Sequence, residues 1–209
     1  MNLVTDIQYF PSIIFYKISY NFTHITIEQC ETWQKMSFRN RCQITGAEGI
    51  IDLSIPLVNG RDQKSFTRDV KIADSLPWQA RHWKTIVSCY NRSPWFEFYR
   101  DELEALYRRP FTFLVDWNLY CLEWSFGVLG MPRSIGLTGE FRKVYTPAEG
   151  VDMRGKLVPK NREEWGSDTP RYRQVFEERI GFLPGLSILD LLFCEGKNAI
   201  RYIRSSTGG

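Results

Sequence analysis

The sequence predicts a single α/β domain, in which an N-terminal βαβ unit and a hairpin form a mixed sheet that packs against a layer of helices from the middle of the chain. Three observations indicate this class. A strand, a helix and a second strand fit into the first 28 residues, and a βαβ unit takes about 30 residues. Two strand-like runs flank a glycine-containing turn at residues 45–49, and three helical patterns follow between residues 77 and 130.

The βαβ unit begins the chain. A strand is expected over residues 2–8 and a helix over residues 12–20, where isoleucine and tyrosine side chains supply the apolar surface. Residues 24–28, His-Ile-Thr-Ile-Glu, alternate between polar and apolar and contain β-branched side chains, which predicts the second strand. Since the connection is a helical crossover, the two strands should pair in parallel.

The hairpin and the helices carry clear local signals. Strands are expected at residues 41–44 and 50–56, and a further short strand at residues 70–72. Pro77 favours a helix that runs to about Asn91, while Ser93 as N-cap and Pro94 as first residue favour a second helix. Asp116 is expected to cap a third helix that ends before Gly130. The side chains expected in the helical core are Leu103, Leu106, Leu119, Leu122 and Phe126.

The last third of the chain is less regular. Loops and short strands are expected over residues 133–165, and a strand over residues 172–176. Ser187 should N-cap a helix that ends near Gly196. The expected domain spans residues 1–204, followed by a flexible tail at residues 205–209.

Composition excludes several classes of protein. The chain has 209 residues, of which 43% are hydrophobic and 15% aromatic, and its formal net charge is +3. The aromatic content is too high for disorder, and the charge is too small to predict a nucleic-acid partner. The apolar stretch at residues 117–131 contains Glu123 and is too short to span a membrane.

Cysteine usage and the N-terminus predict a cytoplasmic protein. The five cysteines, at positions 30, 42, 89, 121 and 194, are widely spaced and include no C-x-x-C, so reduced and mostly buried thiols are expected. The first 20 residues lack the basic region and cleavage site of a signal peptide. There is no phosphate-binding glycine motif, no G-x-S-x-G and no H-E-x-x-H. Neither a cofactor nor a metal ion is therefore expected.

Residues 28–41 form the densest polar segment, directly after the second predicted strand. Lys35 and Arg41 are suited to hold a phosphate or a carboxylate, and Glu31 is suited to act as a general base or to orient a hydroxyl group. The alternative is a solvated loop with surface ion pairs. His82 lies on the first middle helix, where it is either a proton shuttle or a histidine packed among aromatic side chains.

Several segments together resemble the WbqC-like protein family. They are residues 6–11 (Asp-Ile-Gln-Tyr-Phe-Pro), residues 31–41, the strand that ends at residues 55–56, residues 78–99 and residues 186–193, in collinear order over nearly the whole chain. The resemblance implies a link with the synthesis of O-antigen or another bacterial surface polysaccharide, for which an aminoacyl transferase role has been suggested.

The resemblance also implies a site. We expect a cytoplasmic transferase of an aminoacyl or glycosyl-related group that acts on a small anionic donor, either a sugar nucleotide or an acyl donor. The alternative is a non-catalytic binding or scaffolding protein with the same fold. The residues at the polar motif positions of the family are Glu31 and His82, expected to be catalytic, and Gln8, Lys35, Asn40, Arg41 and Asp190, expected to bind substrate.

The hypothesis gives a role to each expected site residue except Asp190. Lys35 and Arg41 hold the anion, Gln8 and Asn40 orient the acceptor, and Glu31 or His82 moves a proton. Since Gln8 and Glu31 follow two parallel strands, they should meet at one edge of the sheet. Gln8, Glu31, Arg41 and His82 should then line a common cavity. The oligomeric state is left open.

Overall fold

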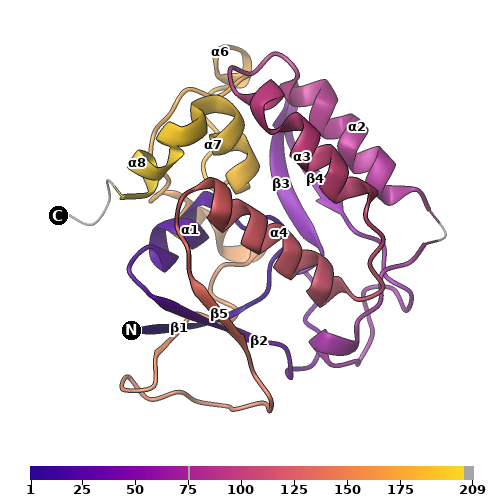
Figure 1. The fold of residues 1–209 in the computed structure, drawn as a ribbon, viewed down its shortest axis with the longest axis vertical. Helices are drawn as coiled ribbons and strands as arrows, with labels where there is room; N and C mark the ends of the chain where they lie inside the picture. Colours follow the sequence, from indigo (N-terminus) through magenta and orange to yellow (C-terminus); the bar gives the residue numbers. More distant parts are fainter. Residues whose placement is uncertain (75, 205–209) are drawn as a thin grey trace.

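The architecture is taken from a computed structural model, which describes residues 1–74 and 76–204. A parallel sheet of four strands in the order β5-β2-β1-β6 occupies one end of the molecule (Figure 1). The strands are β1 (Asn2–Asp6), β2 (His24–Glu28), β5 (Ser134–Leu137) and β6 (Val151–Asp152). The expected tail at residues 205–209 lies outside the described residues.

The βαβ unit is confirmed. β1 pairs with β2 in parallel from Asn2 opposite His24 to Asp6 opposite Glu28. Helix α1 (Ile13–Ser19) connects the two strands and buries Ile13, Ile14 and Phe15. Parallel pairing places the carboxyl ends of both strands at the same edge of the sheet.

The hairpin is also confirmed, as β3 (Arg41–Gly46) paired antiparallel with β4 (Gly49–Ser54). It does not join the parallel sheet, and the expectation of one mixed sheet was wrong in this respect: the hairpin is a separate two-stranded sheet. The reason is that β5 occupies the free edge of β2 and β6 occupies the free edge of β1. Neither strand of the βαβ unit has a free edge to offer the hairpin.

Three helices form the middle layer: α2 (Trp78–Tyr90), α3 (Phe96–Arg108) and α4 (Leu114–Val128). Ser93 does not cap α3, because its hydroxyl group donates a hydrogen bond to the carbonyl of Tyr90 (2.7 Å) and so closes α2 instead. α4 begins two residues before Asp116, since the backbone N–H of Leu114 is held by the carbonyl of Val70 (2.9 Å). The expected helical core is buried, except that Leu119 is only partly buried.

The remaining elements are short. They are η1 (Thr67–Asp69), η2 (Pro159–Asn161), α5 (Arg162–Gly166), α6 (Glu177–Ile180), α7 (Ile188–Glu195), η3 (Gly196–Asn198) and α8 (Ala199–Arg204). Ser187 caps α7 as expected, because its side chain accepts a hydrogen bond from the backbone N–H of Leu189 (3.3 Å). Residues 70–72 make isolated bridges to residues 57 and 113, and residues 172–176 form no strand.

The two faces of the parallel sheet differ in chemistry. Leu3, Ile25 and Ile27 project from one face into the hydrophobic core. Successive side chains of a strand alternate between faces, so Asp6 and Glu28 belong to the opposite face. Figure 1 shows α1 and α4 on the apolar side, while the chain between β5 and β6 loops along the other side. The polar face is therefore covered by a loop and not by a helix.

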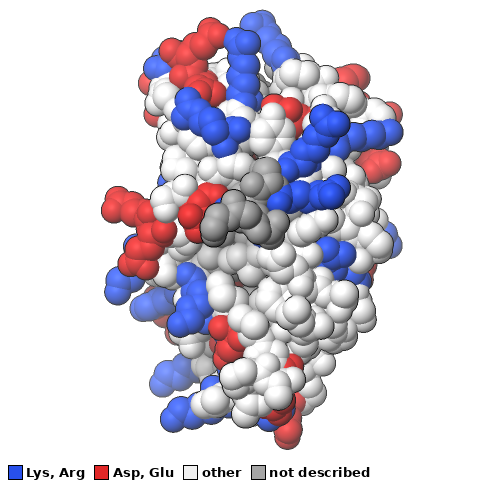
Figure 2. Space-filling view, turned by 90° about the vertical axis from the view of Figure 1, so that its left-hand side faces the viewer, with Lys and Arg blue, Asp and Glu red and all other residues white. Residues whose placement is uncertain are grey.

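The mixed surface charges fit the small net charge of the chain, and the cysteines are free and mostly buried, as expected. Positive and negative side chains are interspersed over the face shown in Figure 2. All five cysteines are free thiols, and four of them are buried. In the described part of the chain, no helix has both the length and the apolar character needed to cross a membrane.

Candidate functional site

Two carboxylates stand at the carboxyl ends of the paired central strands. Asp6 is the last residue of β1, Glu28 is the last residue of β2, and the two are opposite each other in the register. Both side chains are fully buried. Open α/β sheets bind ligands beyond the carboxyl ends of their strands, and this edge is therefore the place to look for a site.

Glu28 is fully paired. Its Oε1 accepts hydrogen bonds from the backbone N–H of Cys30 (2.7 Å) and from the hydroxyl group of Thr138 (2.8 Å). Its Oε2 pairs with the guanidinium of Arg154 (3.1 Å). Each oxygen of this buried carboxylate therefore has a partner from another part of the chain. Glu28 thus joins the ends of β2, β5 and β6.

Arg154 fastens the loop between β5 and β6 over this edge. Its guanidinium pairs with Asp152 (2.7 Å) and donates to the carbonyls of residues 142–143 (2.8 and 3.3 Å). The rings of Phe141 and Tyr145 lie within cation–π distance, 5.6 and 4.9 Å from the guanidinium carbon. Arg154 therefore links several residues of the loop over the polar face to Glu28 at the end of β2.

Asp6 and Gln8 are buried and incompletely paired. Oδ1 of Asp6 accepts a hydrogen bond from the backbone N–H of Gly155 (2.8 Å), whereas Oδ2 has no hydrogen-bond partner within residues 1–74 and 76–204. Gln8 is 1% exposed, and in the same described residues neither atom of its amide group has a partner. An unpaired buried polar group costs about 1–3 kcal/mol. Asp6 and Gln8 are therefore buried side chains with unused hydrogen-bonding capacity.

Glu31 and Arg39 form a buried ion pair next to these groups. Nη2 of Arg39 donates to Oε1 of Glu31, and the two side chains are 2% and 13% exposed. Burial raises the pKa of Glu31 above its ordinary value, Arg39 opposes that rise, and the charges of Asp6 and Glu28 add to it. A carboxyl group with a raised pKa is a better proton acceptor than an ordinary carboxylate.

Unpaired polar atoms continue inward from Arg39. The carbonyl of Arg39 accepts a hydrogen bond from Nδ2 of Asn118 (2.7 Å), and the carbonyl of Glu31 accepts one from the backbone N–H of Thr67 (2.9 Å). Three polar atoms next to these bonds are buried without a hydrogen-bond partner in the described chain, namely Nε of Arg39, Oδ1 of Asn118 and the hydroxyl group of Thr67.

We call the polar residues at this edge of the sheet the strand-end cluster. Its members are Asp6, Gln8, Glu28, Glu31, Arg39 and Arg154.

The chain matches the model of the WbqC-like protein family over residues 7–151. It belongs to the WbqC-like family. The match includes Gln8, Glu28, Glu31 and Arg39 of the strand-end cluster, and it stops before Arg154. The search of curated proteins and the search of solved structures returned no match.

The WbqC-like chain brings two of the expected site residues to the same edge, namely Gln8 and Glu31, which follow β1 and β2. Lys35 lies apart on the surface, where its ammonium pairs with Asp62 (2.6 Å). Asn40 donates to the carbonyl of Ile55 (3.0 Å) and so ties the start of the hairpin to its end. Arg41 is half-buried at the start of β3, and its Nε has no partner in the described residues.

His82 lies behind the strand-end cluster and contacts it through Tyr9. Its Nδ1 is 3.1 Å from the hydroxyl group of Tyr9, the residue after Gln8, and its Nε2 is 3.2 Å from the carbonyl of Ser54. Burial lowers the pKa of His82 from 6.5 to about 4. The imidazole is therefore neutral at pH 7 and is held at both nitrogens.

Asp190 lies elsewhere, in the first turn of α7. Its two carboxylate oxygens accept hydrogen bonds from the hydroxyl groups of Tyr90 and Tyr172, each at 2.6 Å. Burial raises the pKa of Asp190 to about 6, and the two tyrosine hydrogen bonds oppose the rise. Asp190 thus joins α2, α7 and the segment before α6.

Asp6, Glu28, Arg39 and Arg154 of the strand-end cluster were missing from the expected site. Glu28 carried a usable signal, because it is the last residue of the second predicted strand, and Asp6 lies near the end of the first predicted strand. Arg154 carried none, since it is about 126 residues from Glu28 in sequence and lies in a segment without periodicity. In the described part of the chain, no group of three or more His, Cys, Asp or Glu side chains is arranged to hold a metal ion.

Proposed function

We propose that the protein is a cytoplasmic group transferase of bacterial surface-polysaccharide synthesis, with its reacting site at the strand-end cluster. The observation that carries the proposal is the position of Glu31, whose pKa is raised, near Asp6 and at the same sheet edge as Gln8, both of which have unpaired polar atoms in the described chain. Membership of the WbqC-like family supports the place in polysaccharide synthesis. The group transferred is aminoacyl or glycosyl-related.

Glu31 is the proton carrier in this proposal. The carboxylate takes the proton from an acceptor hydroxyl or amino group as that atom bonds to the transferred carbon and the bond to the anionic leaving group breaks. Arg39 is a positioning residue, because its guanidinium fixes the orientation of Glu31. The open amide group of Gln8 offers the acceptor one donor and one hydrogen-bond acceptor.

The anionic part of the donor binds outside the cluster. Asp6, Glu28, Glu31 and Asp152 outnumber Arg39 and Arg154, so an anion placed among them would be repelled. Lys35 and Arg41 are the cationic side chains that we assign to a sugar nucleotide or an acyl donor, with Asn40 between them in the sequence. His82 acts as a support for Tyr9, since a neutral imidazole hydrogen-bonded at both nitrogens keeps its single N–H proton in place and has no free nitrogen to take up another at pH 7.

A ligand screen by thermal shift tests the proposal, with sugar nucleotides, acyl donors and amino acids as candidates. A ligand of the cluster should raise the melting temperature of the wild type and should lose that effect in Gln8→Ala. Gln34→Ala is the matched control, because Gln34 is an exposed glutamine in the same polar segment. Equal shifts in Gln8→Ala and the wild type would place the site elsewhere.

Glu31→Gln separates catalysis from binding. The substitution keeps the size of the side chain and removes its proton acceptor, so binding should persist while turnover of the ligand pair falls. The exposed Glu97→Gln on α3 should change neither. Binding without turnover in the wild type would instead support the non-catalytic binding protein.

A further inference from the structure

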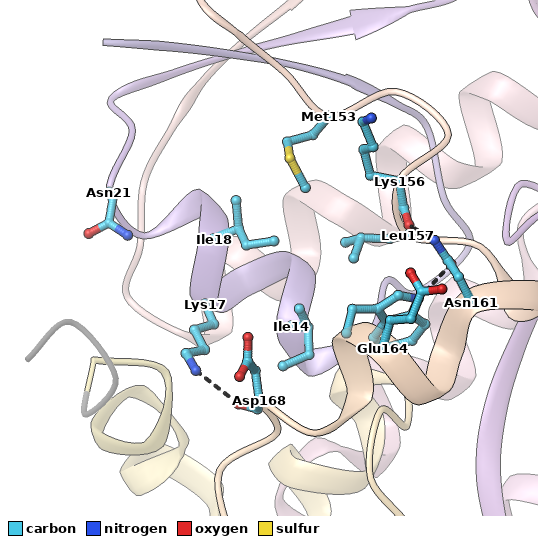
Figure 3. A pocket seen from close by; sticks show the side chains of 11 residues that line it. Ile14, Lys17, Ile18, Asn21, Met153, Lys156, Leu157, Asn161, Glu164 and Asp168 are labelled. Atoms are coloured by element: carbon cyan, nitrogen blue, oxygen red, sulfur yellow. Dashed lines mark hydrogen bonds between the residues drawn. The ribbon is translucent and has the colours of Figure 1, made fainter. Parts of the chain in front are cut away.

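A cavity outside the strand-end cluster lies between α1 and residues 153–168 (Figure 3). Its volume is about 380 Å³, and its floor is apolar. Ile14 and Ile18 come from one face of α1, Met153 and Leu157 come from the turn after β6, and Trp165 comes from α5. Cavities of this size with mostly apolar walls are typical of small-molecule sites.

The aromatic wall of the cavity is fixed. Nε1 of Trp165 donates to the carbonyl of Val158 (3.2 Å) and to Oδ1 of Asn161 (3.0 Å), so the polar atom of the indole is already paired. Phe38 packs edge to face against the same ring at 5.9 Å. The indole thus presents hydrocarbon to the cavity. Met153 adds a flexible thioether that can adapt to the shape of a ligand.

The rim carries charges that balance. Lys17 and Asp168 stand at one end of the cavity and Lys156 and Glu164 at the other (Figure 3). Within residues 1–74 and 76–204 none of the four forms an ion pair, although the ammonium of Lys17 donates to the backbone carbonyl of Asp168 (2.9 Å). One cation and one anion at each end attract neither net-positive nor net-negative molecules. The apolar floor, and not charge, then decides what binds.

One turn separates this cavity from the strand-end cluster. Met153 and Lys156 line the cavity, while Arg154 and Gly155 between them hold Glu28 and Asp6. Gly155 has φ +63°, which a side-chain-bearing residue rarely adopts, and this conformation accompanies the bond from its N–H to Asp6. We propose that the cavity binds a small molecule with an apolar body and no net charge, beside the strand-end cluster. This inference does not depend on the transferase activity.

Fluorescence titration of the full chain with N-phenyl-1-naphthylamine, an uncharged apolar probe, tests the proposal. Saturable binding of one probe per chain is expected. Ile18→Asp, which places a carboxylate in the floor, should weaken binding by roughly tenfold or more. Val58→Asp is the matched control, because Val58 is an apolar residue 58% exposed outside the cavity. It should leave the affinity unchanged.

A charge reversal on the rim provides a second variant that does not disturb the core. Lys156→Glu should weaken binding of the anionic probe 8-anilinonaphthalene-1-sulfonate and leave the neutral probe unaffected, whereas Lys84→Glu on the exposed face of α2 should affect neither. Three results would overturn the proposal: no saturable binding of the neutral probe, full affinity in a folded Ile18→Asp, or wild-type binding of the sulfonate that is tighter than that of the neutral probe by more than about tenfold.

Discussion

Acidification to pH 5 should destabilise the protein through His82. The imidazole is buried, its Nδ1 faces the hydroxyl group of Tyr9, and its Nε2 faces the carbonyl of Ser54. The packing around it is aromatic, with Trp78 at 5.2 Å and Tyr9 at 5.9 Å between ring centroids. A proton added to the ring would create a buried cation with no carboxylate partner among these contacts.

The magnitude follows from the two pKa values. In the unfolded chain His82 titrates near its ordinary pKa of 6.5, and in the folded chain burial lowers its pKa to about 4. Between these values the unfolded chain binds more protons, so the free energy of unfolding falls as the pH falls from 6.5 to 4. At about 1.4 kcal/mol for each pKa unit, the loss is about 2 kcal/mol at pH 5 and about 3 kcal/mol at and below pH 4.

Urea unfolding at pH 7 and pH 5 measures the effect. His82→Gln removes the titrating group, so the difference in stability between the wild type and His82→Gln should shrink by about 2 kcal/mol on going from pH 7 to pH 5. Other titrating groups are common to both proteins and cancel in this difference. Arg81→Gln, on the exposed side of the same helix, should show no such change. A difference that stays constant to within about 0.5 kcal/mol would refute the reasoning.

Three further predictions concern the core and the thiols. Asp190 has a pKa of about 6 in the folded chain against an ordinary value of 3.8, so the free energy of unfolding should fall as the pH rises from 3.8 to about 6. In urea unfolding, the free energy of unfolding of Asp190→Asn should depend less on pH over this range. Leu122→Ala should lower the free energy of unfolding in urea by roughly 2–5 kcal/mol, because Leu122 is 1% exposed, and Leu119→Ala should lower it less. A loss below about 0.5 kcal/mol for Leu122→Ala would contradict the burial of this side chain. Thiol titration of the denatured protein without reductant should return five free cysteines, and two or more in disulfides would contradict the expectation of a reducing compartment.

Local sequence patterns predicted correctly those helices and strands that are determined by the residues within them or directly beside them. The alternation at residues 24–28 is β2, and Ser187 caps α7 as its position suggests. Residues 172–176 show why the same reasoning fails elsewhere. Tyr172 and Gln174 are buried as in a strand. The amide group of Gln174, however, bonds both the N–H and the carbonyl of Leu183 (2.8 Å each), and no neighbouring strand pairs with this segment. Whether an alternating segment joins a sheet depends on the partners that it meets elsewhere in the chain, here Leu183, which the local sequence pattern does not reveal.

In the strand-end cluster, too, some features follow from the local sequence and others depend on residues far away in the chain. Strand order placed Gln8 and Glu31 at one edge, because their positions follow from the βαβ unit alone. The partners of the charged groups did not follow, since Arg154 reaches Glu28 from the far end of the long segment between β5 and β6. Asp6 and Glu28 hold equivalent strand positions, yet Glu28 is paired at both oxygens and Asp6 only at one. Strand position therefore indicates where polar groups gather. Distant residues decide which of those groups, here Asp6 and Gln8, keep polar atoms without a hydrogen-bond partner in the described chain.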